Sequence, residues 1–304
     1  YEVAYGQAVI ACRRTEFISE NGSLALYATR ANYSVVGRDF RYIFHNGRGV
    51  MVSKSNHRAE QLKAPCEFNF FRAPTDNDTG CGMQSAIGVW KVAGAYARTV
   101  SYEAEVLENC VELRYVHRLC SLVDGTVESC YRVFPNGRID VTLTYRKAEG
   151  MPQIPEFGMI FRLYSKFENV CYYGMGPDEN YADRLQGSRL GRYKTKVSSM
   201  YVDYLKPQEC GNRCGIREYR LSDPQGNSFT LYGCDGNLNV SSLPYSPAEL
   251  ENARHAYELP DTLTTVVKVS ASQMGVGGDD SWGAPVLEQY CIKNQDLILK
   301  FSLS

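Results

Sequence analysis

Short segments in which apolar and polar side chains alternate recur along the chain. Apolar residues take every second position at 111–115 and at 139–145, and a further apolar segment lies at 297–303. Successive side chains of a β-strand point to opposite faces, so this period of two predicts strands with one buried and one polar face. Asn136 and Gly137, ahead of the second segment, predict a hairpin with these two residues at the centre of a type I′ turn.

Helical patterns are scarce by comparison. Residues 87–94 give a weak one-sided apolar stripe, and Ser246 with Pro247 can open a second short helix over 247–257. Strands therefore greatly outnumber helices. We expect an all-β fold, a large antiparallel β-sandwich with few short helices, rather than an α/β fold.

Length and charge limit the class of protein. The 304 residues correspond to one large or two small domains at about 100–200 residues each. With 33 basic and 34 acidic residues and no basic arm, the electrostatic footprint of a nucleic-acid-binding protein is missing. Apolar runs stay below the roughly 20 residues that span a bilayer. The strand-like start at Tyr1, without an initiator Met, suggests that residues 1–22 end a preceding module and form a linker.

The cysteines and histidines do not form a recognisable metal site. The chain has 11 cysteines but no CxxC, and its closest pair, Cys210 and Cys214, has no second clustered pair to complete a zinc site. We interpret them as reduced, structural thiols of a cytoplasmic protein. The 4 histidines are dispersed, so neither a metal nor a His-centred acid–base site is expected. No GxSxG is present, which leaves a serine hydrolase unsupported.

The first of three polar, aromatic-rich segments spans residues 70–78. Arg72 can pair bidentately with a carboxylate. The side chains of Asp76, Asn77 and Asp78 readily bond nearby backbone amides and set turns. We interpret the segment as a rigid, hydrogen-bonded loop that holds an interface, with a direct chemical role as the alternative.

The second segment, residues 173–184, concentrates carboxylates. Asp178, Glu179 and Asp183 lie close in sequence beside Arg184. A retaining glycosidase needs two carboxyl groups about 5–5.5 Å apart on opposite sides of a sugar, and neighbours in one loop rarely face each other in that way. The segment is therefore interpreted as a loop pinned by ion pairs rather than as a catalytic pair.

The third segment, residues 274–282, is rich in glycine and ends at Trp282. The glycines would let a loop leave the sheet and project the indole, with Asp279 and Asp280 supporting that loop. An exposed indole suits the C–H face of a sugar because it offers a flat apolar face and one N–H donor. A tryptophan in the hydrophobic core is the alternative. The GxGG is not followed by a helix, so it is no dinucleotide fingerprint.

In this order the three segments resemble the small-chain domain of glycoside hydrolase family 2 β-galactosidases. That family carries RAP-x-DND, G-x-GP-x-E-x-Y-x-DR and GGDDSW motifs, which here stand at residues 72–78, 174–184 and 277–282. Residues 210–217 also resemble the family's G-x-R-x-x-x-R stretch. The resemblance covers residues 23–304, and residues 1–7 resemble the last strand of the family's preceding immunoglobulin-like module.

The resemblance implies a galactose-mutarotase-like supersandwich over 23–304, in a parent that hydrolyses terminal β-galactosides such as lactose with retention. The family's catalytic acid/base and nucleophile lie on a (β/α)₈ barrel, together with the ligands of magnesium and sodium. This chain lacks the strand–helix alternation of a barrel, so no catalytic residue, metal or other cofactor is expected in it. The expected partners are the barrel of the same parent chain and a galactoside, in a parent that is a homo-oligomer; no nucleic acid or membrane is expected.

Trp282 matches the family's tryptophan that forms a platform for the aglycone sugar at the mouth of the active site. The remaining residues of the motifs are expected to brace the domain against the barrel: Arg72, Asp76, Asn77, Asp78, Glu179, Asp183 and Arg184. A stand-alone sugar-binding module using the concave face of the sandwich is the main alternative, and measurable galactose affinity would support it. An aldose epimerase is a weaker one, because no histidine lies in a sugar-facing motif.

Overall fold

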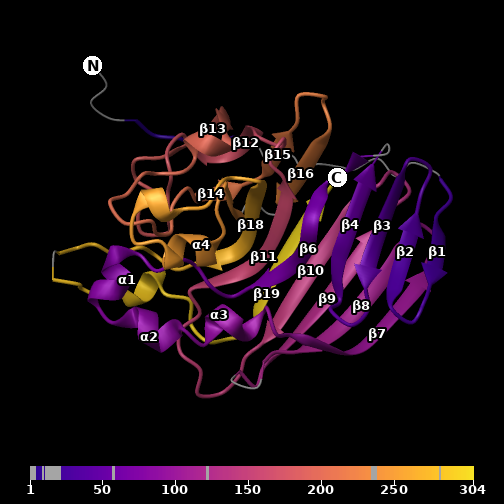
Figure 1. Cartoon of the computed structure of the whole chain (residues 1–304), viewed down its shortest axis with the longest axis horizontal. Coiled ribbons are helices and arrows are strands. Elements are labelled where there is room, and N and C mark those ends of the chain that lie inside the picture. The colour runs from indigo at the N-terminus through magenta and orange to yellow at the C-terminus, as the bar shows by residue number, and fades with distance from the viewer. Residues whose placement is uncertain are drawn as a thin grey trace.

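The computed structural model describes residues 5–8, 10, 22–56, 59–120, 123–233, 238–280 and 282–304. Antiparallel sheets dominate these residues, and the helices are few and short (Figure 1). The prediction of an all-β antiparallel fold is therefore confirmed. The strand-like start predicted to end a preceding module, at Tyr1 to Ala4, lies outside the described residues, and the predicted domain boundary at 22/23 stays a prediction.

The largest sheet has nine antiparallel strands. In spatial order these are β13 (Arg189–Lys196), β12 (Asn169–Gly176), β15 (Glu218–Ser222), β16 (Ser228–Gly233), β19 (Leu297–Leu303), β10 (Ile139–Arg146), β9 (Thr126–Val133), β8 (Val111–Arg118) and β7 (Arg98–Val106). All three segments that the alternating pattern assigned to strands lie in this sheet, as β8, β10 and β19.

Two five-stranded sheets complete the sandwich, and Figure 1 shows β4 of the first beside β6 of the second. The first is β1 (Ala25–Ala28), β2 (Asn32–Val36), β3 (Phe40–His45), β4 (Val50–Asn56) and β5 (Ala59–Glu60). The second is β14 (Arg213–Ile216), β17 (Leu238–Leu243), β18 (Thr264–Gln273), β11 (Glu156–Tyr164) and β6 (Leu62–Asn69).

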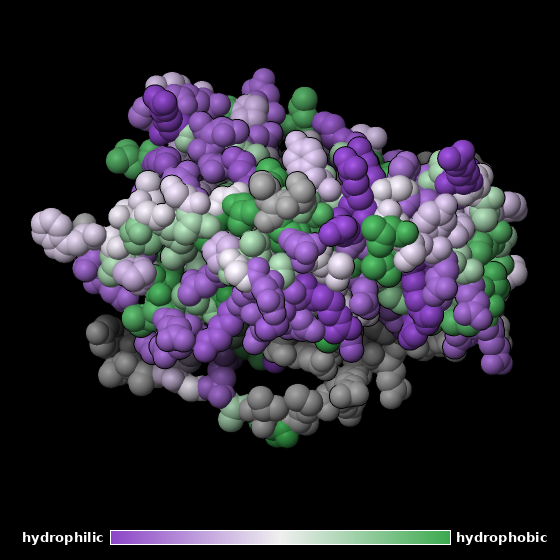
Figure 2. All heavy atoms as spheres, turned by 90° about the horizontal axis from the view of Figure 1, so that it is seen from below, coloured by the Kyte–Doolittle hydropathy of each residue, from purple (hydrophilic) through white to green (hydrophobic). Residues whose placement is uncertain are grey.

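The core lies between the nine-stranded sheet and the two smaller ones. Phe44 of β3 meets Tyr131 of β9 with ring centroids 4.9 Å apart, and Phe161 of β11 meets Phe301 of β19 at 6.1 Å. Polar side chains gather on the outer faces instead. Seen from below, the surface is largely hydrophilic and its hydrophobic side chains lie in separate patches (Figure 2).

The hairpin between β9 and β10 confirms the predicted chain reversal, but the predicted turn type is wrong. The N–H of Gly137 donates to the carbonyl of Phe134 at 2.9 Å, so Pro135 and Asn136 are the central residues of the turn. Proline fixes φ near −65°, which suits the first central position of a type I turn. Gly137 follows with φ 83°, a conformation that glycine adopts without steric cost.

Short helices lie where the two helical patterns are, with different ends. The apolar stripe becomes α2 (Met83–Ile87) and α3 (Trp90–Ala93), which follow α1 (Asp76–Gly80). The second pattern becomes α4 (Pro247–Asn252), opened by a capping box of Ser246 and Glu249. The prediction to residue 257 is too long, because Ala253 is extended (ψ 130°) and ends the helix. The 3₁₀ turns are η1 (Val197–Ser199), η2 (Ala256–Glu258) and η3 (Glu288–Tyr290).

The described part of the chain contains free cysteines and no helix suited to span a membrane. Its cysteines are all free, and many are buried. Burial raises the pKa of the Cys210 thiol to about 12 and that of Cys214 to about 12, which keeps both protonated. Within the same ranges, no helix has the length and apolar character needed to cross a bilayer.

Two lysines are buried in the sandwich in different surroundings. Lys268 on β18 lies between two carboxylates, with its Nζ 2.8 Å from both Glu156 and Glu209. Lys54 on β4 is fully buried, and its Nζ donates to the amide oxygen of Gln61 at 2.7 Å. Its ammonium group thus contacts a neutral amide and lies over aromatic rings, among them that of Tyr42 at 5.3 Å.

Candidate functional site

The loop that follows β18, residues 274–286, carries the most exposed large aromatic side chain of the described residues. Figure 1 shows this loop projecting beyond α1. Trp282 is 91% exposed, whereas Trp90 is 1% exposed and packs in the core. A large exposed indole is informative because such side chains are normally buried. The structure thus places Trp282 outside the hydrophobic core; Ser281, beside it in the motif, lies outside the described residues.

Asp280 shapes the loop locally. One oxygen of its carboxylate accepts the N–H groups of Trp282 at 2.9 Å and Ala284 at 3.1 Å. Such side-chain to backbone bonds set tight turns. Asp279 is exposed, and the hydrogen bonds found among the described residues do not include its carboxylate. Asp280 thus contacts the backbone of the loop, and a supporting role for Asp279 stays a prediction.

Arg72 ties the first motif to the start of this loop. Its guanidinium donates to both oxygens of Asp78 at 3.1 and 3.0 Å, and to the carbonyl of Gly275 at 2.8 Å. A further bond goes to the carbonyl of Met274. Arg72 and Asp78 have side chains that are 0% exposed. Their contacts are therefore within this chain, and they offer no surface to a second domain.

Asn77 and Asp183 hold the same loop further along. The N–H of Gly277 donates to Oδ2 of Asp183 at 2.8 Å, and Nδ2 of Asn77 donates to the carbonyl of Ala284 at 3.0 Å. These approaches need glycine. A Cβ on Gly275 would lie 2.5 Å from Oδ2 of Asp183, and one on Gly277 would lie 2.3 Å from Nδ2 of Asn77.

Asp76 and Asp78 organise α1 beneath the loop. The Asp78 carboxylate accepts the N–H of Thr75 at 3.0 Å, and the Thr75 hydroxyl accepts the N–H of Asp78 at 3.0 Å, which forms a capping box. Asp76 accepts from Nε2 of Gln208 at 2.8 Å. The predicted bonding of these acids to nearby backbone amides is thus present for Asp78, while Asp76 reaches a distant glutamine.

Glu179 and Arg184, in the second motif, contact partners outside the Trp282 loop. Glu179 accepts the N–H of Gly211 at 2.7 Å and the hydroxyl of Tyr204. Arg184 lies 3.9 Å from the same carboxylate and is 53% exposed. The Glu179 side chain is 8% exposed, so the pair is only partly open to solvent. Glu179 and Asp183 therefore have separate partners.

Sequence reasoning did not single out Asn180, Asn212 or Gln208, which join the motifs to each other. Oδ1 of Asn180 accepts the N–H of Cys214 at 2.7 Å, and Nδ2 of Asn212 donates to the carbonyl of Asn180 at 2.8 Å. Both asparagines are buried. Asn180 lies within the second motif but at one of its unspecified positions, so the motif did not point to it; for Gln208 the sequence offers no signal.

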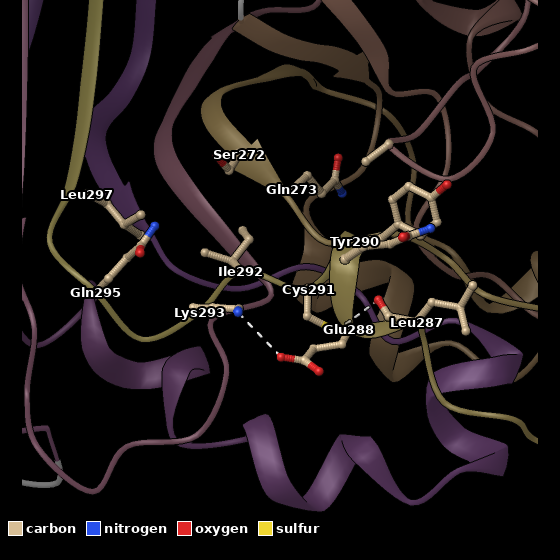
Figure 3. A pocket seen from close by; sticks show the side chains of 12 residues that line it. Ser272, Gln273, Leu287, Glu288, Tyr290, Cys291, Ile292, Lys293, Gln295 and Leu297 are labelled. Carbon is tan, nitrogen blue, oxygen red and sulfur yellow. Dashed lines mark hydrogen bonds and ion pairs between the residues drawn. The ribbon is translucent and has the colours of Figure 1, made fainter.

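A cavity of about 840 Å³ adjoins the C-terminal end of the loop (Figure 3). Glu288 and Lys293 form an ion pair on its lining, with their charged atoms 3.3 Å apart. Gln273 also lines it; its side chain is 6% exposed, and its amide has no partner among the described residues. Glu288 is the one acid among the described lining residues, so this cavity contains no opposed pair of carboxyl groups.

His117 lies apart from the Trp282 loop. His117 is buried in the core, where Nε2 lies 3.0 Å from Oγ of Ser129. Burial lowers the pKa of its imidazole to about 4, which keeps the ring neutral near pH 7. The described residues also contain no group of three or more His, Cys, Asp or Glu side chains placed to hold a metal ion.

Comparisons with known proteins give a consistent assignment. The family described as "Beta galactosidase small chain" matches residues 36–303. A β-galactosidase from Streptococcus thermophilus is 38% identical over 296 residues, which cover 97% of this chain and 29% of that protein. The β-galactosidase small subunit of Latilactobacillus sakei is 30% identical over 316 residues, covering 93% of this chain and 98% of the subunit.

Solved structures give only a distant likeness. The galactose 1-epimerase from Lactobacillus acidophilus NCFM aligns with a TM-score of 0.49 and 6% identity, covering 93% of this chain and 98% of the other; this is too remote to inform the site. The chain spans 29%, 30% and 26% of the length of the first three β-galactosidases that it matches. On the extent of the family match and these identities, the chain belongs to the β-galactosidase small chain family.

Proposed function

We propose that this chain is the non-catalytic part of a β-galactosidase and supplies Trp282 to the mouth of an active site whose catalytic carboxylates lie elsewhere in the parent. The parent hydrolyses terminal β-galactosides such as lactose with retention, and its catalytic barrel is the partner of this chain. The observation that carries the proposal is the 91% exposure of Trp282 on a loop that buried side chains hold from beneath.

The indole is chemically suited to a sugar. Its flat apolar face can stack on the C–H groups of a pyranose ring, and its N–H can donate to a hydroxyl. The exposed position keeps both features available. Because stacking requires shape rather than charge, Trp282 would orient the aglycone sugar and take no part in proton transfer.

The acids near the loop are not placed for bond cleavage. Retaining hydrolysis needs two carboxyl groups about 5–5.5 Å apart across the glycosidic bond. Asp183 already accepts from the backbone of the loop, and Asp280 accepts the N–H groups of Trp282 and Ala284. Asp78 is buried against Arg72. These carboxylates stabilise the loop, and the catalytic pair must come from another part of the parent.

The isolated chain is expected to show no turnover of a chromogenic β-galactoside. The physical reason is the lack of an opposed acid and nucleophile around the loop. The measurement is a rate assay on the purified chain beside the complete β-galactosidase as positive control. Turnover that co-elutes with the pure chain and persists in Trp282→Ala would refute the proposal.

In the complete enzyme, Trp282→Ala is expected to raise KM for lactose about tenfold, the equivalent of about 1.4 kcal/mol of lost stacking. Trp282→Phe keeps an aromatic face and should lose less. Initial rates against lactose concentration give both values. Trp90→Phe, in the core, is the matched control for replacing a tryptophan. Unchanged KM in Trp282→Ala would contradict the assigned role.

A sugar-binding module is the second candidate, favoured by a hollow of about 340 Å³ on the outer face of the large sheet. Tyr102, Arg114 and Thr142 line it and offer an aromatic face, a donor and a hydroxyl. Calorimetric titration of the chain with galactose separates the candidates. Binding that Tyr102→Ala abolishes would favour the module, and a flat titration at millimolar sugar would favour the first proposal.

Several expectations concern the parent as a whole and stay predictions. These are magnesium and sodium bound by the barrel, a homo-oligomeric assembly and a cytoplasmic location. The free thiols support the last of these, since reducing compartments keep cysteines unpaired.

A further inference from the structure

We propose that Asp183 and Asn77 are positioning residues that fix the pose of Trp282 from the two ends of its loop, rather than contacts to another domain. The inference rests on the proposed function, since it gives the pose of Trp282 a use. It assigns a role in specificity to side chains that do not touch the sugar themselves.

The two side chains grip the loop on either side of the tryptophan. Asp183 accepts the N–H of Gly277 at 2.8 Å, ahead of the exposed residues Gly278 to Asp280 and Trp282. Asn77 donates to the carbonyl of Ala284 at 3.0 Å, after the tryptophan. The start of the loop is fixed in turn by backbone bonds, from Met274 N to Pro155 O at 2.9 Å and from Gly275 N to Tyr290 O at 3.0 Å. The segment that carries Trp282 thus lies between two side-chain anchors, and within it Asp280 accepts the N–H groups of Trp282 and Ala284.

The Asp183 anchor is built for close contact. A bond from a backbone N–H to an ionised carboxylate is shorter and stronger than one between neutral groups. Gly275 and Gly277 let the backbone approach both anchors, because a Cβ on either would lie within 2.5 Å of the Asp183 or the Asn77 side chain. The second oxygen of Asp183 is buried and has no partner among the described residues, so the loop bond is the one that fixes this carboxylate.

Arg72 also contacts the loop but serves a wider purpose. It pairs with Asp78 in the interior, so its removal would leave a buried charge and destabilise the whole fold. Asp183 and Asn77 are only half-buried. Substitutions at these two positions therefore test loop positioning without dismantling the core.

The test measures the loop directly in this chain. In the wild type, the backbone amide order parameters of Trp282 and Gly283 are expected to be about 0.8. In Asp183→Ala both order parameters should fall below about 0.6. Asp183→Asn keeps an acceptor oxygen and should restore the wild-type values. Asp178→Ala, in the same motif and exposed, is the matched control and should leave the loop unchanged.

A second variant guards against loss of folding. Asn77→Ala removes the other anchor and should loosen the same segment, with the order parameters of β18 unaltered. If the amides of Trp282 and Gly283 stay rigid in both Asp183→Ala and Asn77→Ala, the positioning role is wrong. Loosening that extends into β18 would equally overturn it, because it would show a general structural role.

A double-mutant cycle in the complete β-galactosidase connects the anchor to function. Asp183→Ala should raise KM for lactose about threefold with kcat little changed, and this effect should vanish in a Trp282→Ala background. A full effect of Asp183→Ala without Trp282 would contradict the proposal. The two proposals fail in different ways. If Asp183→Ala loosens the amides of Trp282 and Gly283 but Trp282→Ala leaves KM unchanged, the positioning role holds and the proposed contact of Trp282 with the sugar is wrong.

Discussion

Lys268→Met is expected to lower the free energy of unfolding by roughly 3–5 kcal/mol, as removal of one member of a buried ion cluster does. The side chain of Lys268 is 5% exposed, and those of its partners Glu156 and Glu209 are 1% and 0% exposed. Methionine fills a similar volume but leaves two carboxylates facing each other without a cation between them. The loss of charge, not of packing, therefore dominates.

The directions of the pKa shifts are those expected for a cation buried between two carboxylates. Burial, with the neighbouring Glu209 charge, raises the pKa of Glu156 despite the opposing effect of Lys268. For Lys268 the burial effect is outweighed by the two carboxylates, which raise the pKa of its ammonium group. One cation thus holds two acids from β11 and from the segment ahead of β14.

Urea unfolding followed by circular dichroism measures this loss. Lys293→Met is the matched control, because Lys293 pairs with Glu288 on the surface, where their side chains are 69% and 81% exposed. Exposed pairs contribute within about 1 kcal/mol. Equal midpoints for Lys268→Met and the wild type would show that the cluster carries no net stabilisation.

Lys54 should make the stability of the fold depend on pH: the free energy of unfolding is expected to rise as the pH rises. Burial is the first cause that lowers the pKa of its ammonium group to about 7, against a smaller opposing effect of Glu60. The unfolded chain keeps a lysine pKa near about 10.4. Between these two values the unfolded state binds more protons than the folded state, so the free energy of unfolding rises with pH across that window.

From pH 7 to pH 9 this linkage is worth about 2 kcal/mol. Lys54→Met removes the titrating group and should lack that gain, while other groups titrate alike in both proteins and cancel in the difference. Unfolding curves of the wild type and Lys54→Met at pH 7, 8 and 9 give the comparison. A constant difference between the two proteins across this range would mean that Lys54 stays protonated when buried.

The strands of the large sheet were predictable because alternation is a local property. Residues 111–115 and 139–145 lie in β8 and β10, whose buried and exposed positions alternate along most of each strand. Turn and helix ends were less predictable. The geometry at Gly137 depends on the proline two residues earlier, and α4 ends at Asn252 because the next residue becomes extended.

The candidate site was predictable in its parts and not in its assembly. The motifs singled out the residues, but their convergence on one loop depends on pairings such as that of Asp183 with Gly277, which are far apart in sequence. Sequence patterns do not report such distances. The buried cluster around Lys268 was missed for a related reason, since a lysine in a strand resembles any solvent-facing position until its neighbours are known.

The anchoring of the Trp282 loop also bears on how such a protein can be divided between polypeptides. The side chains that hold the loop all belong to this one chain: Arg72, Asn77, Asp183 and Asp280. A chain of this extent, made separately, would meet its counterpart with the tryptophan already oriented. Little conformational entropy of the loop would then be lost on docking. Division of the protein into two polypeptides ahead of this region would therefore add little to the free-energy cost of assembly.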